Sequence, residues 1–166
     1  MVASADDMRA LGRRLAAMLR PGDLVVLNGA LGTGKTTLVQ GIGAGLGVRG
    51  PVTSPTFVIA RVHPSVTGGP ALVHADAYRL ASPAEVDDLD LDASLETSVT
   101  VVEWGGGLAE ALAADRLEVS IALAGPGAGP GGPGGVPGGA EPDQEPRAVR
   151  LEGHGARWDT ASVPRA

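Results

Sequence analysis

Apolar residues recur at helical intervals in the N-terminal segment from residue 4 to residue 19. Ser4 precedes them as a possible N-cap, and Asp7 stands three residues later. The apolar positions share one helical face and are Met8, Leu11, Leu15 and Leu19. The pattern therefore predicts an amphipathic first helix.

A strand, a glycine-rich turn and a second helix follow in the pattern. Residues 24–27, LVVL, form a short apolar run typical of a strand buried on both faces. After the turn, apolar residues return at helical spacing until Gly47, a residue suited to ending a helix. This second stripe consists of Leu38, Val39, Ile42 and Leu46.

The remaining chain alternates strand-like and helix-like stretches. Ser82, Pro83 and Glu85 combine an N-cap, a first-position proline and a capping box, so one helix should begin at Pro83. A further helix is predicted over residues 107–116. Strands are predicted over residues 56–63, 71–76, 98–104, 116–123 and 147–153. This alternation predicts an α/β fold with a mostly parallel sheet that ends in a C-terminal antiparallel hairpin.

A glycine- and proline-rich stretch, GPGAGPGGPGGVPGG, separates the last two predicted strands. It lacks a strict three-residue glycine period and has too little apolar surface to offset the entropy of ordering. We expect residues 124–146 to form a disordered insert at a hairpin tip and residues 154–166 to form a flexible tail. The chain of 166 residues is interpreted as one domain over residues 1–153.

Composition and charge narrow the classes of function. The absence of cysteine excludes disulfides and thiolate metal sites. The formal net charge of -6 argues against broad binding to nucleic-acid backbone. The N-terminus has the pattern of neither a signal peptide nor a membrane anchor, so we expect a cytoplasmic protein. The acid-rich residues 85–96 fit either a solvated helix and loop or a docking face for a basic partner.

The glycine-rich turn, NGALGTGKTT, carries candidate chemistry. Gly29, Gly34, Lys35 and Thr36 match the phosphate-loop pattern G-x-x-x-x-G-K-[ST], and they stand between a predicted strand and a predicted helix, as that loop requires. Glycines let backbone N–H groups surround a phosphate, the lysine reaches the β- and γ-phosphates, and the threonine hydroxyl binds Mg²⁺. The alternative is a glycine turn that binds nothing.

Lys35 is the single lysine among 13 basic residues. An arginine guanidinium is planar and too bulky for a slot that accepts a compact ammonium on a flexible stem. The bias of the chain toward arginine therefore indicates a role for Lys35 that depends on its shape.

Two carboxylates stand at predicted strand ends, where the metal-binding acid of a phosphate-loop protein is expected. Glu103 follows the apolar run TVV, and Asp76 follows LVHA. His63 and His74 are interpreted as packing or surface residues. With one lysine, the chain has no N-K-x-D segment for guanine, which leaves adenine as the expected base.

Four motifs in order, LNGALGTGKTT, TSPTF, HADAYRL and VEW, resemble the bacterial TsaE family, also called YjeE. The resemblance runs from about residue 8 to residue 123. It implies a three-layer P-loop NTPase-like domain that binds ATP and Mg²⁺ and hydrolyses ATP in the formation of N6-threonylcarbamoyladenosine in tRNA. It also implies TsaD and TsaB as partners, with tRNA reached only indirectly through their complex.

The resemblance also implies roles for individual residues. Lys35, Asp76 and Glu103 are the expected catalytic residues, and Thr36 and Glu103 are the expected metal ligands. Residues 54–57 resemble the first switch segment of the family, near the γ-phosphate. The expected nucleotide contacts are Gly29, Leu31, Gly32, Thr33, Gly34, Lys35, Thr36, Thr37 and Trp104.

Ala30 stands where the family usually has an acidic residue, as in G-[DE]-L-G. Because backbone groups cradle the phosphate, we expect this change to affect the edge of the loop or nucleotide exchange, and not phosphate binding itself. Two other functions remain open, a small-molecule kinase and a nucleotide-gated adaptor with negligible hydrolysis. The loop is not followed by a cluster of arginines resembling a kinase lid, which weakens the kinase interpretation.

Overall fold

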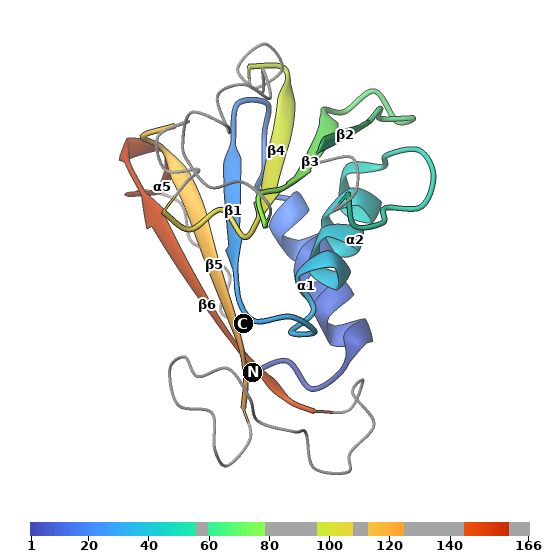
Figure 1. Ribbon diagram of the computed structural model, residues 1–166. Coiled ribbons are helices and arrows are strands. Elements are labelled where there is room, and N and C mark those ends of the chain that lie inside the picture. The colour runs from blue at the N-terminus through green and yellow to red at the C-terminus, as the bar shows by residue number, and fades with distance from the viewer. Residues whose placement is uncertain (56–59, 79–95, 108–112, 125–144, 160–166) are drawn as a thin grey trace.

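The computed structural model describes residues 1–55, 60–78, 96–107, 113–124 and 145–159. Its strands are β1 (Leu24–Asn28), β2 (Ala60–His63), β3 (Ala71–Asp76), β4 (Ser98–Glu103), β5 (Arg116–Leu123) and β6 (Arg147–His154). They form one sheet in the order β2-β3-β4-β1-β5-β6 (Figure 1). The central strands β3, β4, β1 and β5 are parallel, and both outer strands are antiparallel to their neighbours. The predicted mostly parallel α/β sheet with a C-terminal antiparallel hairpin is confirmed.

Two helices, α1 (Ala5–Ala16) and α2 (Lys35–Leu46), pack on one face of the sheet (Figure 1). α1 begins as predicted, since the Ser4 hydroxyl accepts a hydrogen bond of 3.1 Å from the Asp7 N–H. α2 ends as predicted at Gly47, whose φ of 66° is left-handed. None of the helices in the described part of the chain has the length and hydrophobicity that a membrane crossing needs.

The two helices pack closely because glycines stand where they cross. A Cβ at Gly12 of α1 would collide with the Leu38 carbonyl oxygen and lie 2.7 Å from the backbone nitrogen of Ile42. A Cβ at Gly41 of α2 would collide with the Arg9 carbonyl oxygen. A larger residue at either position would push the helix axes apart. The crossing therefore fixes the start of α2, and the glycine loop before it, against the sheet.

β1 contributes to both faces of the sheet, as its continuous apolar run predicts. Val25 and Leu27 belong to the main core under α1 and α2, whereas Leu24 and Val26 belong to a second core on the opposite face. Along β5, buried residues alternate with more exposed ones. The buried residues lie on one face of the sheet and are Leu117, Val119 and Ile121.

Several predicted segments lie wholly or partly outside the described residues. These are the helix from Pro83, the start of the strand over 56–63 together with the end of the predicted switch segment, and most of the insert. The helix predicted over 107–116 is described only at its ends, which are not helical. The neck of the insert is described: the Ala124 N–H donates to the Pro146 carbonyl at 2.8 Å, which closes the β5–β6 hairpin.

The end of the chain differs from the predicted flexible tail. β6 extends to His154, and a short helix α5 (Ala156–Asp159) packs back so that Trp158 is only 4% exposed. Arg157 donates to both carboxylate oxygens of the buried Asp23 at 2.9 Å. Burial of the indole ring favours an ordered segment. The prediction is therefore wrong for residues 154–159, and residues 160–166 lie outside the described part.

Candidate functional site

The glycine loop joins the end of β1 to the start of α2, at the carboxyl edge of the parallel strands. Two of its positions require glycine. A Cβ at Gly29 would lie 2.5 Å from the Ile121 carbonyl oxygen and 2.8 Å from the Thr33 hydroxyl. Gly34 caps α2 with a left-handed φ of 99°. The loop thus has the tight backbone that a phosphate cradle needs.

The first turn of α2 presents backbone donors beside this loop. Gly34 provides no side-chain cap, and within the described residues the N–H groups of Lys35, Thr36 and Thr37 have no acceptor. Unpaired N–H groups and the positive end of the helix dipole favour an anion at this position. These donors fit a phosphate group.

Lys35 is buried, and its ammonium is held between the loop and an aromatic ring. Its Nζ donates to the carbonyl oxygens of Gly29 at 2.8 Å and Ala30 at 3.0 Å. The same atom lies 3.7 Å from the centroid of the Trp104 ring, within the range of a cation–π interaction. The loop and the ring together leave room for a compact cation.

Thr36 and Glu103 place two oxygen-bearing side chains in contact. Thr36 Oγ1 donates to Glu103, with distances of 2.9 Å to Oε1 and 3.3 Å to Oε2. Glu103 ends β4 and is 3% exposed. A hydroxyl and a carboxylate are the ligands that Mg²⁺ takes in nucleotide sites, where phosphate and water complete its shell. Among the described residues, no group of three or more His, Asp or Glu side chains is arranged to hold a metal.

Asp76 ends β3 and is paired with Glu103 in the parallel register. Its Oδ1 accepts the Tyr78 N–H at 2.9 Å, and its Oδ2 lies 3.5 Å from the hydroxyl of Ser54, in the predicted switch segment. Burial lowers the pKa of Lys35 from 10.5, and the charges of Glu103 and Asp76 partly oppose this shift. The structure thus places two carboxylates close to the lysine.

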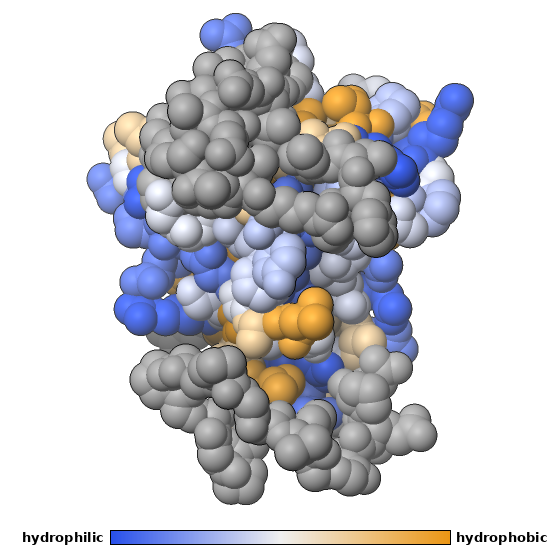
Figure 2. Space-filling view, in the orientation of Figure 1, coloured by the Kyte–Doolittle hydropathy of each residue, from blue (hydrophilic) through white to orange (hydrophobic). Residues whose placement is uncertain are grey.

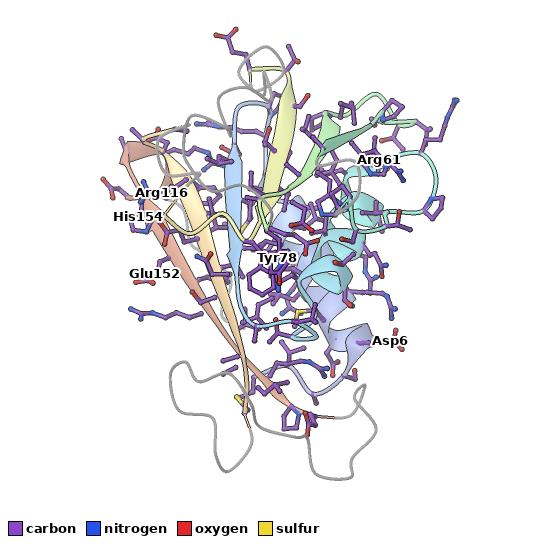
Figure 3. All side chains as sticks on the ribbon, viewed as in Figure 1. Asp6, Arg61, Tyr78, Arg116, Glu152 and His154 are labelled. Carbon is purple, nitrogen blue, oxygen red and sulfur yellow. The ribbon has the colours of Figure 1, made fainter. Side chains whose placement is uncertain are left out.

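Trp104 follows Glu103 with a φ of 59°, which few non-glycine residues adopt. The backbone N–H of Trp104 donates to the Leu27 carbonyl at 2.9 Å, and this hydrogen bond joins the turn to the end of β1. The Tyr78 ring packs against the indole with a centroid separation of 5.1 Å and an interplanar angle of 57°. Figure 3 shows Tyr78 projecting over the junction of β1 and α2.

These side chains surround one cavity of about 300 Å³. It is lined by Leu31, Gly32, Gly34, Lys35, Thr36, Thr37, Ser54, Asp76, Glu103 and Trp104. The predicted catalytic and metal-binding residues are therefore brought together. Two predicted nucleotide contacts do not line it: Gly29 lines a neighbouring cavity beside β5 and β6, and Thr33 is buried with its hydroxyl on the Ala30 carbonyl.

The mouth of the cavity is partly apolar. Leu31 is 89% exposed and Tyr78 is 64% exposed, and both lie beside Trp104 and Asp76. Figure 2 shows hydrophobic surface in the lower middle of this face, with hydrophilic residues along both flanks. Exposed apolar side chains at the entrance of a site are typical of surfaces that a ligand or partner covers.

Three residues of the site were not predicted from the sequence. His74, interpreted as a packing or surface residue, is buried, and its Nε2 lies 2.8 Å from Glu103 Oε1. Strand alternation puts His74 on the same face as Asp76, and this was the available signal. Asn28 Oδ1 accepts the Gly106 N–H at 3.0 Å, and Tyr78 covers Trp104. Both contacts join residues that are far apart in the sequence, so no local sequence pattern predicts them.

Comparisons with known proteins agree with the motifs. The family model for "Threonylcarbamoyl adenosine biosynthesis protein TsaE" matches residues 2–126. The chain is 56% identical over 157 residues to the tRNA threonylcarbamoyladenosine biosynthesis protein TsaE of Streptomyces coelicolor, covering 94% of this chain and 97% of that protein. It is 38% identical over 121 residues to the Bacillus subtilis protein of the same name, covering 72% and 74%.

A solved structure has a similar fold. The crystal structure of YdiB from Bacillus subtilis aligns with a TM-score of 0.67 and 29% identity, covering 93% of this chain and 83% of that one. The family model and the named relatives give the same family. The chain belongs to the TsaE family of threonylcarbamoyl adenosine biosynthesis proteins.

Proposed function

We propose that this protein binds ATP with Mg²⁺ and hydrolyses the ATP in support of N6-threonylcarbamoyladenosine formation in tRNA. One observation carries the proposal: Lys35, Thr36, Asp76 and Glu103 lie around a single cavity at the start of α2. This set supplies a cation for phosphate, two oxygen ligands for a metal and a further carboxylate. The names of the matched relatives supply the pathway.

Phosphate binding is assigned to the loop and to Lys35. The N–H groups of the first turn of α2 face an anion with the positive end of the helix dipole. The Lys35 ammonium donates to two loop carbonyls. A phosphate oxygen is a stronger acceptor than a carbonyl, so we expect nucleotide binding to draw the ammonium from these carbonyls to the phosphates.

The metal is assigned to Thr36 of α2 and to Glu103 at the end of β4, and the attacking water is assigned to Asp76 at the end of β3. Thr36 and Glu103 would hold Mg²⁺, which when bound neutralises charge on the phosphate oxygens. Asp76 is a buried acceptor whose carboxylate is held by the Tyr78 N–H. From this position it orients the attacking water.

The partners we expect are TsaB and TsaD, with tRNA reached only through their complex. The net charge of -6 fits a chain that does not itself bind nucleic-acid backbone. The acid-rich residues 85–96, a candidate docking face, lie outside the described part. The cytoplasm is the expected location.

The test is ATP hydrolysis by the purified chain, measured alone and with TsaB and TsaD. We expect magnesium-dependent phosphate release that is weak in isolation and rises with the partners. Transfer of the γ-phosphate to a small-molecule acceptor would identify a kinase, and ATP binding without phosphate release in either condition would identify an adaptor. Unchanged hydrolysis in Glu103→Ala and Asp76→Ala would show that the site lies elsewhere.

A further inference from the structure

Glu103 is held from two sides. On the helix side, its Oε1 accepts the Thr36 hydroxyl at 2.9 Å. On the sheet side, the same Oε1 lies 2.8 Å from Nε2 of His74, whose side chain is 0% exposed. The carboxylate proposed to bind the metal therefore has a fixed orientation before any ligand arrives.

The sheet register creates this contact. β3 and β4 are parallel, with His74 opposite Val101 and Asp76 opposite Glu103. Side chains alternate along a strand, so His74, Asp76 and Glu103 share the face that carries α2. His74 thus reaches Glu103 along the diagonal of the register.

The hydrogen bond also defines the tautomer of the imidazole. A carboxylate accepts hydrogen bonds, so Nε2 carries the hydrogen. His74 Nδ1 is buried and has no hydrogen-bond partner among the described residues. The geometry therefore fits an imidazole that donates from Nε2 to Glu103.

We propose that His74 is a positioning residue, which holds the Glu103 carboxylate in the orientation that metal binding requires. This inference rests on the proposed function, because it assigns Glu103 to the metal. Groups that hydrogen-bond a metal ligand orient it, and their removal typically lowers metal affinity by about 10–100-fold.

The chain offers a matched control in His63. This histidine lies on the neighbouring strand β2 and is 4% exposed, so it is nearly as buried as His74. Its Nε2 has no hydrogen-bond partner among the described residues, and it does not line the cavity. Replacing His63 removes a buried imidazole from the neighbouring strand, and the structure shows no contact between His63 and Glu103.

The experiment compares His74→Leu, His74→Gln and His63→Leu with the wild type. ATP affinity is measured by calorimetry, once with Mg²⁺ and once with EDTA. We expect His74→Leu to weaken binding about 10–100-fold with Mg²⁺ and to leave binding in EDTA unchanged. Glutamine places an amide donor near the position of Nε2 and should recover most of the loss. His63→Leu should match the wild type under both conditions.

An equal loss in Mg²⁺ and in EDTA would indicate general damage to the site and overturn the inference. No loss in His74→Leu, or a glutamine variant no better than leucine, would overturn it too. Nitrogen-15 NMR of the free wild-type chain tests the hydrogen bond without nucleotide: His74 should be protonated on Nε2, and protonation on Nδ1 alone would contradict us. A wild type whose ATP binding ignored Mg²⁺ would instead overturn the proposed function.

Discussion

The Lys35 ammonium lies 3.7 Å from the centroid of the Trp104 ring while it donates to the carbonyl oxygens of Gly29 and Ala30. These contacts enclose the cation on the loop side and on the ring side. The enclosure gives a structural reason for the single lysine of a chain that otherwise uses arginine.

Lys35→Arg keeps the charge and changes the shape. Because a planar guanidinium is bulkier than the ammonium that contacts both the loop and the ring, we expect this variant to bind ATP no better than Lys35→Ala. Isothermal titration with Mg²⁺ and ATP measures this. Near-wild-type affinity in the arginine variant would show that charge alone matters at this position.

Lys35 should also affect how the free energy of unfolding depends on pH in the alkaline range. Burial lowers its pKa from 10.5, so between the lowered pKa and 10.5 the folded chain binds fewer protons than the unfolded chain. The free energy of unfolding should therefore rise with pH across that window. As Lys35 is the only lysine, Lys35→Met should lack this rise in urea unfolding. Parallel pH profiles for the two proteins would count against the assignment.

Asp76→Asn keeps the size of the side chain and removes its charge. We expect ATP binding close to that of the wild type, and hydrolysis about 10²–10⁴-fold slower, since an acceptor for the attacking water is lost. Asp6→Asn is the control, because Asp6 is 93% exposed on α1. Hydrolysis is measured as phosphate release at saturating ATP. Equal rates of hydrolysis in the Asp76→Asn and Asp6→Asn variants would show that Asp76 has no role in hydrolysis.

Gly12→Ala should destabilise the protein. The new Cβ would collide with the Leu38 carbonyl oxygen, which is a backbone atom of α2 and cannot move away by a change of rotamer. Overpacking outweighs the gain in helix propensity, and we expect a net loss of about 1–2 kcal/mol in the free energy of unfolding. At Gly69 the nearest atom to a new Cβ lies 3.6 Å away, so Gly69→Ala should be nearly neutral. Similar urea midpoints for both variants would contradict the packing argument.

Arg157→Leu tests the ordered C-terminus. The Arg157 and Asp23 side chains are 13% and 3% exposed. Among the described residues, the mutation leaves the buried carboxylate with only the more distant and mostly exposed Arg20 guanidinium at 3.9 Å as a cation, so it should lower stability, by at most about 3–5 kcal/mol. Arg150 and Glu152 form an exposed pair, with 74% and 42% exposure, and Arg150→Leu should change stability by less than about 1 kcal/mol. Thermal and urea unfolding measure both. Equal effects would mean that α5 adds little to the fold.

Local signals explain why the first half of the fold was predictable. α1 begins after the N-cap residue Ser4, and α2 ends at Gly47, which has a left-handed conformation. Each of these signals is directly adjacent in sequence to the helix that it begins or ends. The glycine loop is equally local, because its spacing and its flanking strand and helix are contiguous in the sequence. Asp76 and Glu103 were recognisable as acids at the ends of apolar strands.

The parts that could not be predicted depend on contacts between distant residues. The Arg157–Asp23 pair joins positions 134 residues apart, and α5 is a helix of 4 residues, too short for a periodic pattern. The His74–Glu103 contact depends on the pairing of β3 with β4, a register that a single sequence does not give. The ring contact of Tyr78 with Trp104 joins residues from two different strand ends, and Trp104 has a positive φ that its residue type does not predict.

The hydrogen bond between Ala124 and Pro146 has a consequence for how relatives can diverge. It closes the neck of the insert at the carboxyl end of β5, the strand beside β1 and its glycine loop, and Arg147 Nε lies about 4.0 Å from the position of a Cβ on Gly34. Doubling the length of a flexible loop adds only about 0.6 kcal/mol of closure free energy. Relatives can therefore differ in the number of residues between Ala124 and Pro146 at little cost in free energy, while the paired strands β5 and β6 stay the same.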